Sequence, residues 1–348
     1  MKKLRVLVAI AILLFSIIAI AFIKARTTSY SIETTGKLFI VNKLSSNVTV
    51  FDLTKGEQVA ILPIDMEPHE ATTSFYGDKV IVTNYGGPEE MGKSLTVIDA
   101  KTFKEVRRVR VDESLKPHGV VAVPNSNCVA VATDVGNDLL VIDIEVGQIK
   151  KKIPTTQIYS HLLTYHPTDS IAYVSNLSSG SVTVIDTNKD EVVKVIPCGK
   201  GTEGIDITPD GEEIWVTNNR DETISIINTK TLEIVSVLTA GEEPSRLQFT
   251  LDGKYCLVAN SVSGTISVYN TATKKLQKNI VLPGKKNIVE RILYHTPRPV
   301  CIAMHPNGKY AFVANSNAVR VEVIDLNSLK VVSTIGTGRI PDGLAIAL

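Results

Sequence analysis

The stretch that decides the fold is GIDITPDGEEIWVTNNRDETISIINTKTLEIVSVL, residues 204–238. It contains four short apolar runs with a period of two, and the breaks between them carry Pro209-Asp210-Gly211, Asn218 and Asn228. Runs of this kind, separated by turn-forming residues, indicate short antiparallel strands joined by tight turns. The stretch therefore predicts one four-stranded antiparallel sheet.

The same pattern recurs along the chain, and two polar anchor residues mark each copy. The first anchor ends the second strand of a copy, at Asn42, Asn84, Thr133, Asn176, Asn218, Asn260 and Asn315. The second anchor ends the third strand ten or more residues later, at Asp52, Asp99, Asp143, Asp186, Asn228, Asn270 and Asp325. Insertions at 86–93 and 282–297 interrupt a period near 42 residues. Asn and Asp often bond the backbone of a following turn, so we expect Asx turns at both anchors.

Seven copies with four strands each indicate the blades of a β-propeller. The first copy begins at its second strand, residues 37–42, and the chain ends with an unpaired first strand, residues 341–347. The sequence thus predicts an all-β, seven-bladed propeller of four-stranded antiparallel blades, closed by the C-terminal strand completing the first blade. This closure removes the open edge that an unclosed sheet would expose.

The N-terminus differs from the repeats. Lys2, Lys3 and Arg5 precede an uncharged run from Val6 to Ile23, which is longer than the ~7–15 apolar residues of a signal peptide and near the lower end of the ~17–25 that span a bilayer. We therefore expect residues 1–27 to be a signal peptide or a signal anchor, and residues 28–348 to be the propeller. The propeller is then exported to the periplasm or cell surface, or held at the cytoplasmic membrane by residues 6–23.

Composition narrows the classes of partner. The 348 residues carry 37 Lys and Arg against 36 Asp and Glu, for a formal net charge of +1. Wrapping nucleic acid or lying on an anionic membrane requires clustered basic residues, so we expect no nucleic acid partner and membrane contact only through the N-terminal segment. Four cysteines have no metal-binding spacing: Cys128, Cys198, Cys256 and Cys301. They are interpreted as buried or half-buried free thiols, and the alternative is a disulfide.

Several segments resemble the YVTN-type β-propeller repeat family, which occurs in exported bacterial and archaeal surface proteins. They are YVSN at 173–176, VTN at 216–218, TPDG at 208–211 and SVTVID at 181–186. The resemblance covers residues 37–348 and implies the propeller fold. It does not imply one activity, because surface-layer proteins, ligand-binding propellers, subunits of cofactor enzymes and lyases share this repeat.

Ligands of propellers bind at one mouth of the central channel, beside the loops that lead into the innermost strands. Aligning those loops gives a ring of seven residues, one from each blade: His69, His118, His161, Glu203, Ser245, Val300 and Asp342. Asp342, the three histidines and Glu203 are consecutive around this mouth ring. Imidazole and carboxylate groups suit zinc, copper, iron or nickel, so the five residues are a candidate site for a divalent transition metal. The alternative is that each histidine bonds neighbouring backbone; His166 and His305, in His-Pro turns, are expected at the surface.

Three arginines lie next to the same positions, at Arg246, Arg298 and Arg339. They could bind a carboxylate or phosphate of a ligand, or form rim ion pairs with residues such as Glu243. The 282–297 insertion precedes this mouth and is either a lid or a surface loop.

Two classes of function follow. The first is a binding or scaffold propeller that is not an enzyme and presents a metal or small-molecule site, or a surface for an envelope protein. The second is a metal-dependent enzyme resembling the virginiamycin B lyase or lactonase type, or a propeller that carries a haem or quinone. The chain has no C-x-x-C-H motif, so a haem would be bound non-covalently.

Overall fold

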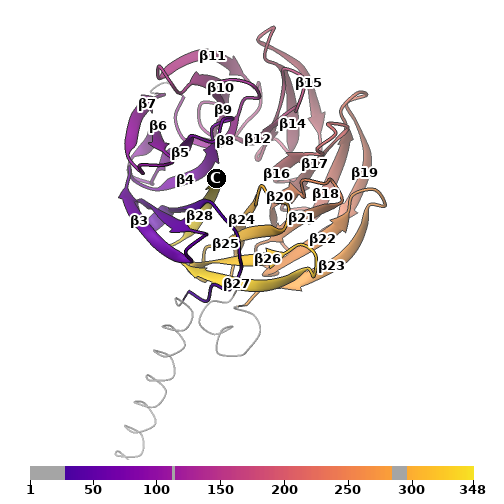
Figure 1. Ribbon diagram of the computed structural model, residues 1–348. Coiled ribbons are helices and arrows are strands. Elements are labelled where there is room, and N and C mark those ends of the chain that lie inside the picture. The colour runs from indigo at the N-terminus through magenta and orange to yellow at the C-terminus, as the bar shows by residue number, and fades with distance from the viewer. Residues whose placement is uncertain (1–27, 112–113, 284–295) are drawn as a thin grey trace, which may run out of the picture.

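The structure is a computed structural model that describes residues 28–111, 114–283 and 296–348. Its strands form seven four-stranded antiparallel sheets arranged as blades around a central channel (Figure 1). The predicted fold class is thereby confirmed. Apart from the turn of 3-10 helix η1 (Lys43–Ser45), every named element in the described residues is a strand.

The blades are numbered from the one that contains β1, and their strands are given from the channel outward. Blade 1 contains β28 (Pro341–Ala347), β1 (Lys37–Asn42), β2 (Asn47–Asp52) and β3 (Glu57–Pro63). Blade 2 contains β4 (Pro68–Thr73), β5 (Lys79–Gly86), β6 (Met91–Asp99) and β7 (Glu105–Arg110). Blade 3 contains β8 (Pro117–Ala122), β9 (Cys128–Thr133), β10 (Asp138–Asp143) and β11 (Gln148–Pro154). Blade 4 contains β12 (Ser160–Tyr165), β13 (Ile171–Asn176), β14 (Ser181–Asp186) and β15 (Glu191–Pro197).

The remaining blades repeat this order. Blade 5 contains β16 (Thr202–Ile207), β17 (Glu213–Asn218), β18 (Thr223–Asn228) and β19 (Glu233–Thr239). Blade 6 contains β20 (Pro244–Phe249), β21 (Tyr255–Asn260), β22 (Thr265–Asn270) and β23 (Lys275–Val281). Blade 7 contains β24 (Pro299–Met304), β25 (Tyr310–Asn315), β26 (Arg320–Asp325) and β27 (Lys330–Gly336).

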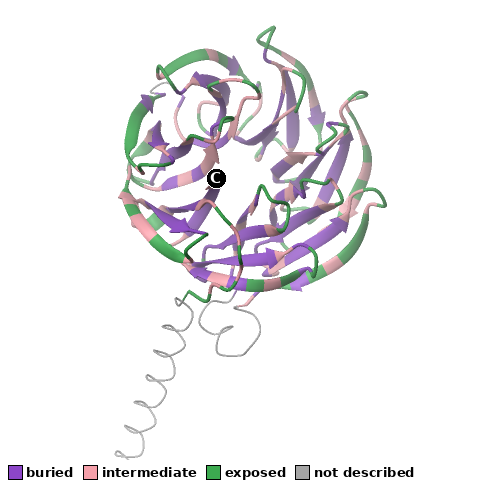
Figure 2. Cartoon of the chain, in the orientation of Figure 1, coloured by how far each residue is buried: buried purple, intermediate pink, exposed green. Residues whose placement is uncertain are grey.

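The hydrophobic core lies between the faces of neighbouring blades. Trp215 of blade 5, for example, is fully buried and packs edge-on against Phe249 of blade 6, with the ring centroids 5.4 Å apart. The middle two strands of each blade are the most buried, whereas outermost strands such as β7 and β11 are largely exposed (Figure 2). Burying a large apolar side chain contributes about 1.5–3 kcal/mol, so this repeated packing holds the ring together.

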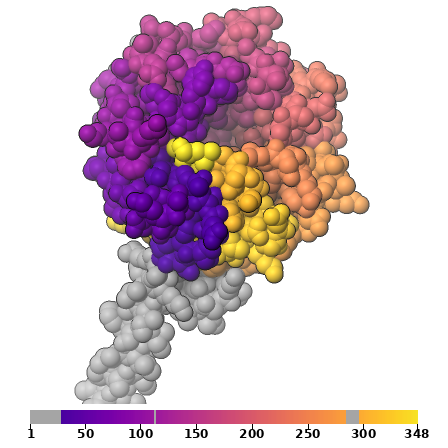
Figure 3. Space-filling view, viewed as in Figure 1, coloured from indigo at the N-terminus to yellow at the C-terminus, as the bar shows by residue number. Residues whose placement is uncertain are grey.

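The C-terminal strand closes the ring, as predicted. β28 pairs antiparallel with β1, from Lys37 opposite Ala347 to Asn42 opposite Pro341. In the space-filling view the C-terminal residues lie against the N-terminal strands, beside the hollow near the centre of the ring (Figure 3). The C-terminal strand β28 and the N-terminal strand β1 thus belong to the same sheet, and this pairing closes the ring of blades.

The two anchors behave differently. Each second anchor accepts bonds from the turn that follows it; Asp52 Oδ1, for example, accepts from the amides of Thr54 and Lys55 at 2.9 and 3.0 Å. Those Asx turns are confirmed. The expectation was wrong for the first anchors. In five of them, Asn42, Asn84, Asn176, Asn218 and Asn260, the side-chain amide reaches the next strand instead. Asn218 Nδ2, for example, donates to Thr223 Oγ1 and Ser225 Oγ, both at 3.0 Å. This bond can form because the tight hairpin brings the end of the second strand opposite the start of the third, as with Asn218 and Thr223.

Residues 28–36 form a strap along blade 7. Ser29 and Thr334 exchange backbone hydrogen bonds of 2.8 Å, and Tyr30 packs edge-on against Phe51 of blade 1. The strap also covers His305, which is 1% exposed and lies 2.8 Å from the Thr35 carbonyl through Nε2. The surface position expected for His305 was therefore wrong, because a segment distant in the sequence buries it.

Two segments for which the sequence suggested a role lie outside the described residues. They are the N-terminal segment 1–27 and positions 284–295 of the 282–297 insertion. Among the residues that are described, no helix has the length and apolar character required to cross a membrane. All four cysteines are free; Cys256 and Cys301 are buried, and Cys128 and Cys198 are partly exposed. The interpretation of the cysteines as free thiols is confirmed.

Candidate functional site at the channel mouth

A β-bulge at the start of every innermost strand creates the mouth ring. The first residue of each of these strands pairs with the first anchor of the same blade, for example Pro117 with Thr133, and the register then shifts by one residue. A bulge leaves the extra residue unpaired and redirects its side chain. His118 stands at this position in blade 3, and the predicted ring residues stand at it in the other blades.

The residue before each of these strands has a left-handed backbone. The φ angles are positive at Glu67, Lys116, Tyr159, Gly201, Glu243, Arg298 and Ile340. Ile340, with φ of 52°, is the most strained of them, because β-branched side chains are rarely accommodated in this region. The same turn in all seven blades aims the ring residues at one opening.

All seven ring residues line a single cavity of about 380 Å³. Arg246 and Arg298 line it as well, but Arg339 does not. Arg298 NH1 forms a rim ion pair with Glu243 Oε2 at 3.2 Å, and Arg339 is exposed. Of the three arginines, Arg246 alone is brought deep into the site.

The three histidines stack on one another. The ring centroids of His69 and His118 are 4.3 Å apart, and those of His118 and His161 are 3.8 Å apart with an angle of 28° between the rings. His118 is 1% exposed, and its Nδ1 has no hydrogen-bond partner. A buried polar atom without a partner is costly by about 1–3 kcal/mol, so His118 is the position where a ligand would relieve a penalty.

His69 has a charged side chain close to each ring nitrogen. Its Nε2 accepts a hydrogen bond of 2.9 Å from Lys43 Nζ, and its Nδ1 lies 2.9 Å from Asp342 Oδ2. Burial acts to raise the pKa of Asp342, but His69, Arg246 and Lys43 outweigh it and hold that pKa below its usual value. Lys43 and Asp342 thus fix the orientation of this ring.

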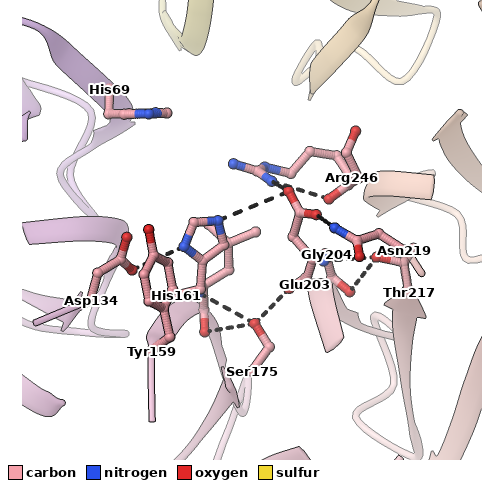
Figure 4. Close-up of polar contacts among 12 residues, drawn as sticks. His69, Asp134, Tyr159, His161, Ser175, Glu203, Gly204, Thr217, Asn219 and Arg246 are labelled. Atoms are coloured by element: carbon pink, nitrogen blue, oxygen red, sulfur yellow. Dashed lines mark hydrogen bonds and ion pairs between the residues drawn. The ribbon is translucent and has the colours of Figure 1, made fainter. Parts of the chain in front are cut away.

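His161 is held at one nitrogen only. Its Nδ1 lies 2.9 Å from Asp134 Oδ1, while its Nε2 is 3.9 Å from Glu203 Oε1 (Figure 4). The second oxygen of Asp134 accepts a 2.7 Å bond from the Tyr85 hydroxyl, and the Tyr85 hydroxyl lies 3.1 Å from that of Tyr159. Nε2 of His161 remains available to the cavity.

The pKa values of the stacked imidazoles shift in opposite directions. Burial lowers the pKa of His118 well below its usual value, and the neighbouring His161 and His69 lower it further. Burial also acts to lower the pKa of His161, but the adjacent Asp134 and Glu203 carboxylates outweigh it and raise that pKa. Of His118 and His161, His118 is therefore the imidazole that stays neutral, the form in which histidine binds metals.

The sequence interpretation missed Glu70 and three residues that follow first anchors. Glu70 follows His69 in the bulge of β4, and Arg246 occupies the equivalent position in β20. Lys43, Tyr85 and Asp134 directly follow the first anchors of blades 1, 2 and 3, and the same position supplies Asn219, Ser261 and Ser316 elsewhere. Aligning the residue after each first anchor would have found Lys43, Tyr85 and Asp134.

Arg246 crosses the channel. Its NH1 donates to Glu203 Oε1 in the adjacent blade 5 at 2.9 Å, and its NH2 contacts Glu70 Oε1 in blade 2. Burial acts to lower the pKa of Arg246, but Glu70 and Glu203 outweigh it and raise that pKa. The guanidinium is thus a permanent cation at the base of the mouth cavity.

Within the part of the chain that the structure describes, two groups of side chains have the donors and spacing for a metal ion. One ligand atom each from His118, Asp134 and His161 lie within 4.8 Å of one another, as do single atoms from His69, Glu70 and His118. The first group is entirely buried and uses His118, whose Nδ1 lacks a partner. Nitrogen and carboxylate donors of this kind fit zinc, copper, iron or nickel. His69 fits less well, because its Nε2 is bonded to Lys43 and the Asp342 carboxylate lies 2.9 Å from its Nδ1.

Comparisons with known proteins agree on the fold. A family model described as "Lactonase, 7-bladed beta-propeller" matches residues 23–290 of the chain. Among solved structures, hydrazine synthase of Kuenenia stuttgartiensis is similar at 21% identity and a TM-score of 0.69, over 80% of this chain and 89% of that chain. A functionally unknown protein from Desulfotomaculum acetoxidans is similar at 15% identity and a TM-score of 0.74, over 90% and 99% of the two chains.

A third similar structure is the dihydro-heme d1 dehydrogenase NirN in complex with DHE, at 17% identity and a TM-score of 0.63, over 88% of this chain and 64% of that one. No curated protein sequence matches the chain. Likeness to solved structures at these identities shows the fold alone.

Proposed function

The chain belongs to the lactonase family of seven-bladed β-propellers, and we propose that it acts as a binding protein whose channel mouth holds a divalent transition metal. The observation that carries this proposal is the buried His118, which has a nitrogen, Nδ1, without a partner and belongs to a group with His161 and Asp134 whose ligand atoms lie within 4.8 Å of one another. A bound metal would take that nitrogen as a ligand and supply a Lewis acid facing the cavity.

The remaining parts of the proposal rest on the sequence. The YVTN-type repeats and the apolar run at 6–23 support a role outside the cytoplasm, with a small molecule or an envelope protein as the partner. The small excess of positive charge, +1 over the whole chain, gives no reason to expect nucleic acid.

The metal proposal is tested on the purified full chain by elemental analysis and by thermal melting with added Zn²⁺, Cu²⁺ or Ni²⁺. We expect the wild type to hold a stoichiometric ion and to melt at a higher temperature with the preferred metal, because a ligand that binds the folded state stabilises it. The variant His69→Ala/His118→Ala/His161→Ala should lose both properties. His166→Ala is the matched control, since His166 lies in a turn and contacts the Gly211 carbonyl instead.

A wild type without metal, whose melting temperature ignores all three ions, would contradict the proposal. Metal retained by the triple variant would place the site elsewhere and would equally contradict it.

A second candidate is hydrolysis of a lactone, favoured by the contact of Asp134 with His161. The carboxylate orients the imidazole so that Nε2 can take a proton from a water attacking the ester carbonyl. The imidazolium can then return this proton to the alkoxide that leaves when the ring C–O bond breaks. Lactone hydrolysis by the wild type that disappears in Asp134→Asn, with Arg298→Gln still active, would favour this candidate.

A further inference from the structure

Arg246 ties together three blades at the base of the mouth. It projects from the bulge of β20 in blade 6 and meets Glu203 from blade 5 and Glu70 from blade 2 (Figure 4 shows the Glu203 contact). The side chains are 12%, 13% and 10% exposed, respectively. Arg246 lines both the mouth cavity and a second cavity of about 310 Å³ along the innermost strands. The Arg246 side chain therefore lies between the mouth cavity and the second cavity.

The two acidic partners of Arg246 also belong to the surroundings of the histidines. Glu70 forms one candidate ligand group with His69 and His118. Glu203 Oε1 is shared, at 2.9 Å from Arg246 NH1 and 3.9 Å from His161 Nε2. The Glu70 and Glu203 carboxylates, which lie beside the three histidines, are thus already paired with the Arg246 guanidinium.

Because a metal ion and a guanidinium are both cations, they compete for these carboxylates and repel each other through a poorly screened interior. We infer that Arg246 determines the cation affinity of the mouth: it occupies Glu70 and Glu203 as an internal cation and confines a metal to His118, His161 and Asp134. This inference rests on the proposed function. According to this inference, Arg246 sets the affinity for the metal and does not bind an anionic ligand, because its guanidinium is already paired with Glu70 and Glu203.

The test compares metal affinity by calorimetric titration of the full-length wild type, Arg246→Gln, Arg246→Lys and Arg298→Gln. Arg246→Gln should bind Zn²⁺, Cu²⁺ or Ni²⁺ at least about tenfold more tightly, since it removes one positive charge near the metal and releases two carboxylates. Arg246→Lys keeps the charge and should stay close to wild type. Arg298→Gln is the matched control at the rim of the same cavity.

A structural role alone would lower the melting temperature of Arg246→Gln without tightening metal binding, and that result would overturn the inference. Weaker binding would overturn it as well, and so would an equal tightening in Arg246→Lys. If Arg246→Gln does not fold, Arg246→Gln/Glu70→Gln removes the pair as a unit. This variant releases only Glu203 and has no net change of charge, so a smaller tightening than in Arg246→Gln is expected.

The outcomes also separate this inference from the proposed function. Binding by the wild type that is unchanged in Arg246→Gln overturns the inference alone. Binding that occurs only in Arg246→Gln supports the inference and contradicts the proposed function. Absence of binding in every variant overturns both.

Discussion

At the residue scale, equivalent positions of one repeat carry opposite chemistry. The second residue of the bulge is Glu70 in blade 2 and Arg246 in blade 6, and these two meet across the channel. The first residue of the bulge is His118 in blade 3 and Val300 in blade 7. Since the fold holds these positions in one ring regardless of their identity, single substitutions can build a site without disturbing a blade.

The protonation of Asp206, which lines the second cavity of about 310 Å³, should make the stability of the protein depend on pH. Its two oxygens accept bonds from the amides of Ile207 at 2.9 Å and Phe249 at 3.0 Å, yet burial raises its pKa from 3.8 to about 6. The folded state therefore binds the proton more tightly than the unfolded state. Stability should fall as pH rises from about 4 to about 6 and should then level off, by up to about 3 kcal/mol in total.

The substitution Asp206→Asn removes this titration. It loses one acceptor at every pH, so the informative quantity is the difference in unfolding free energy between wild type and variant, measured in urea at about pH 4 and about pH 7.5. That difference should shift in favour of the variant at the higher pH. Parallel pH profiles of the two proteins would contradict the expected role of Asp206.

At the element scale, each blade is held by its own hairpins and the ring is held by β28. The first-anchor amides bond hydroxyls of the next strand in most blades, as Asn260 does with Ser267 at 2.8 Å. Blade 7 differs, because Arg320 and Glu322 form a buried ion pair at 2.6 Å in place of the hydroxyls.

Removal of residues 339–348 should prevent a soluble, monomeric fold. The deletion takes away β28, with Leu344, Ala345 and Ala347 all at most 5% exposed, and leaves the edge of β1 unpaired. An unpaired edge promotes association with other chains. Size-exclusion chromatography and thermal melting should show aggregation or a strongly lowered melting temperature.

The control for this deletion removes only Leu348, which is 77% exposed. A shortened chain that lacks 339–348 and still elutes as a monomer with the melting temperature of this control would show that β28 is dispensable.

At the scale of the whole molecule, the strap joins the propeller to the segment that precedes it. Thr28 Oγ1 accepts a bond of 3.1 Å from the Gly336 amide at the outer edge of blade 7. A tether formed by residues 1–27 would accordingly reach the propeller at the outer edge of blade 7, at the end of β27 that lies on the side of the mouth.

We expect the full chain, produced in a bacterial host, to be exported and to fractionate with the membrane or the periplasm. A chain starting at Thr28 keeps the strap and should remain in the cytosol with the melting temperature of the exported domain. Intact mass of the exported protein distinguishes an anchor from a cleaved signal peptide. Recovery of the full chain in the cytosolic fraction would contradict export.

The period-two apolar runs and their turn residues were sufficient to predict the fold, because blades 2 to 7 are each made of four strands consecutive in sequence. The seven-fold register also predicted the mouth ring, since a bulge at one position of every repeat must face one opening. For the same reason the closure by residues 341–347 could be predicted from the phase of the repeat alone.

The interactions of the ring residues could not be predicted in this way. Lys43 with His69, Asp134 with His161 and Arg246 with Glu70 join different blades, and the burial of His305 comes from a strap some 270 positions away in the chain. Such contacts depend on how far each blade is rotated around the channel and on which side chains then reach one another. Local periodicity places a residue on a face, whereas its partner, its protonation and its exposure are set by three-dimensional packing.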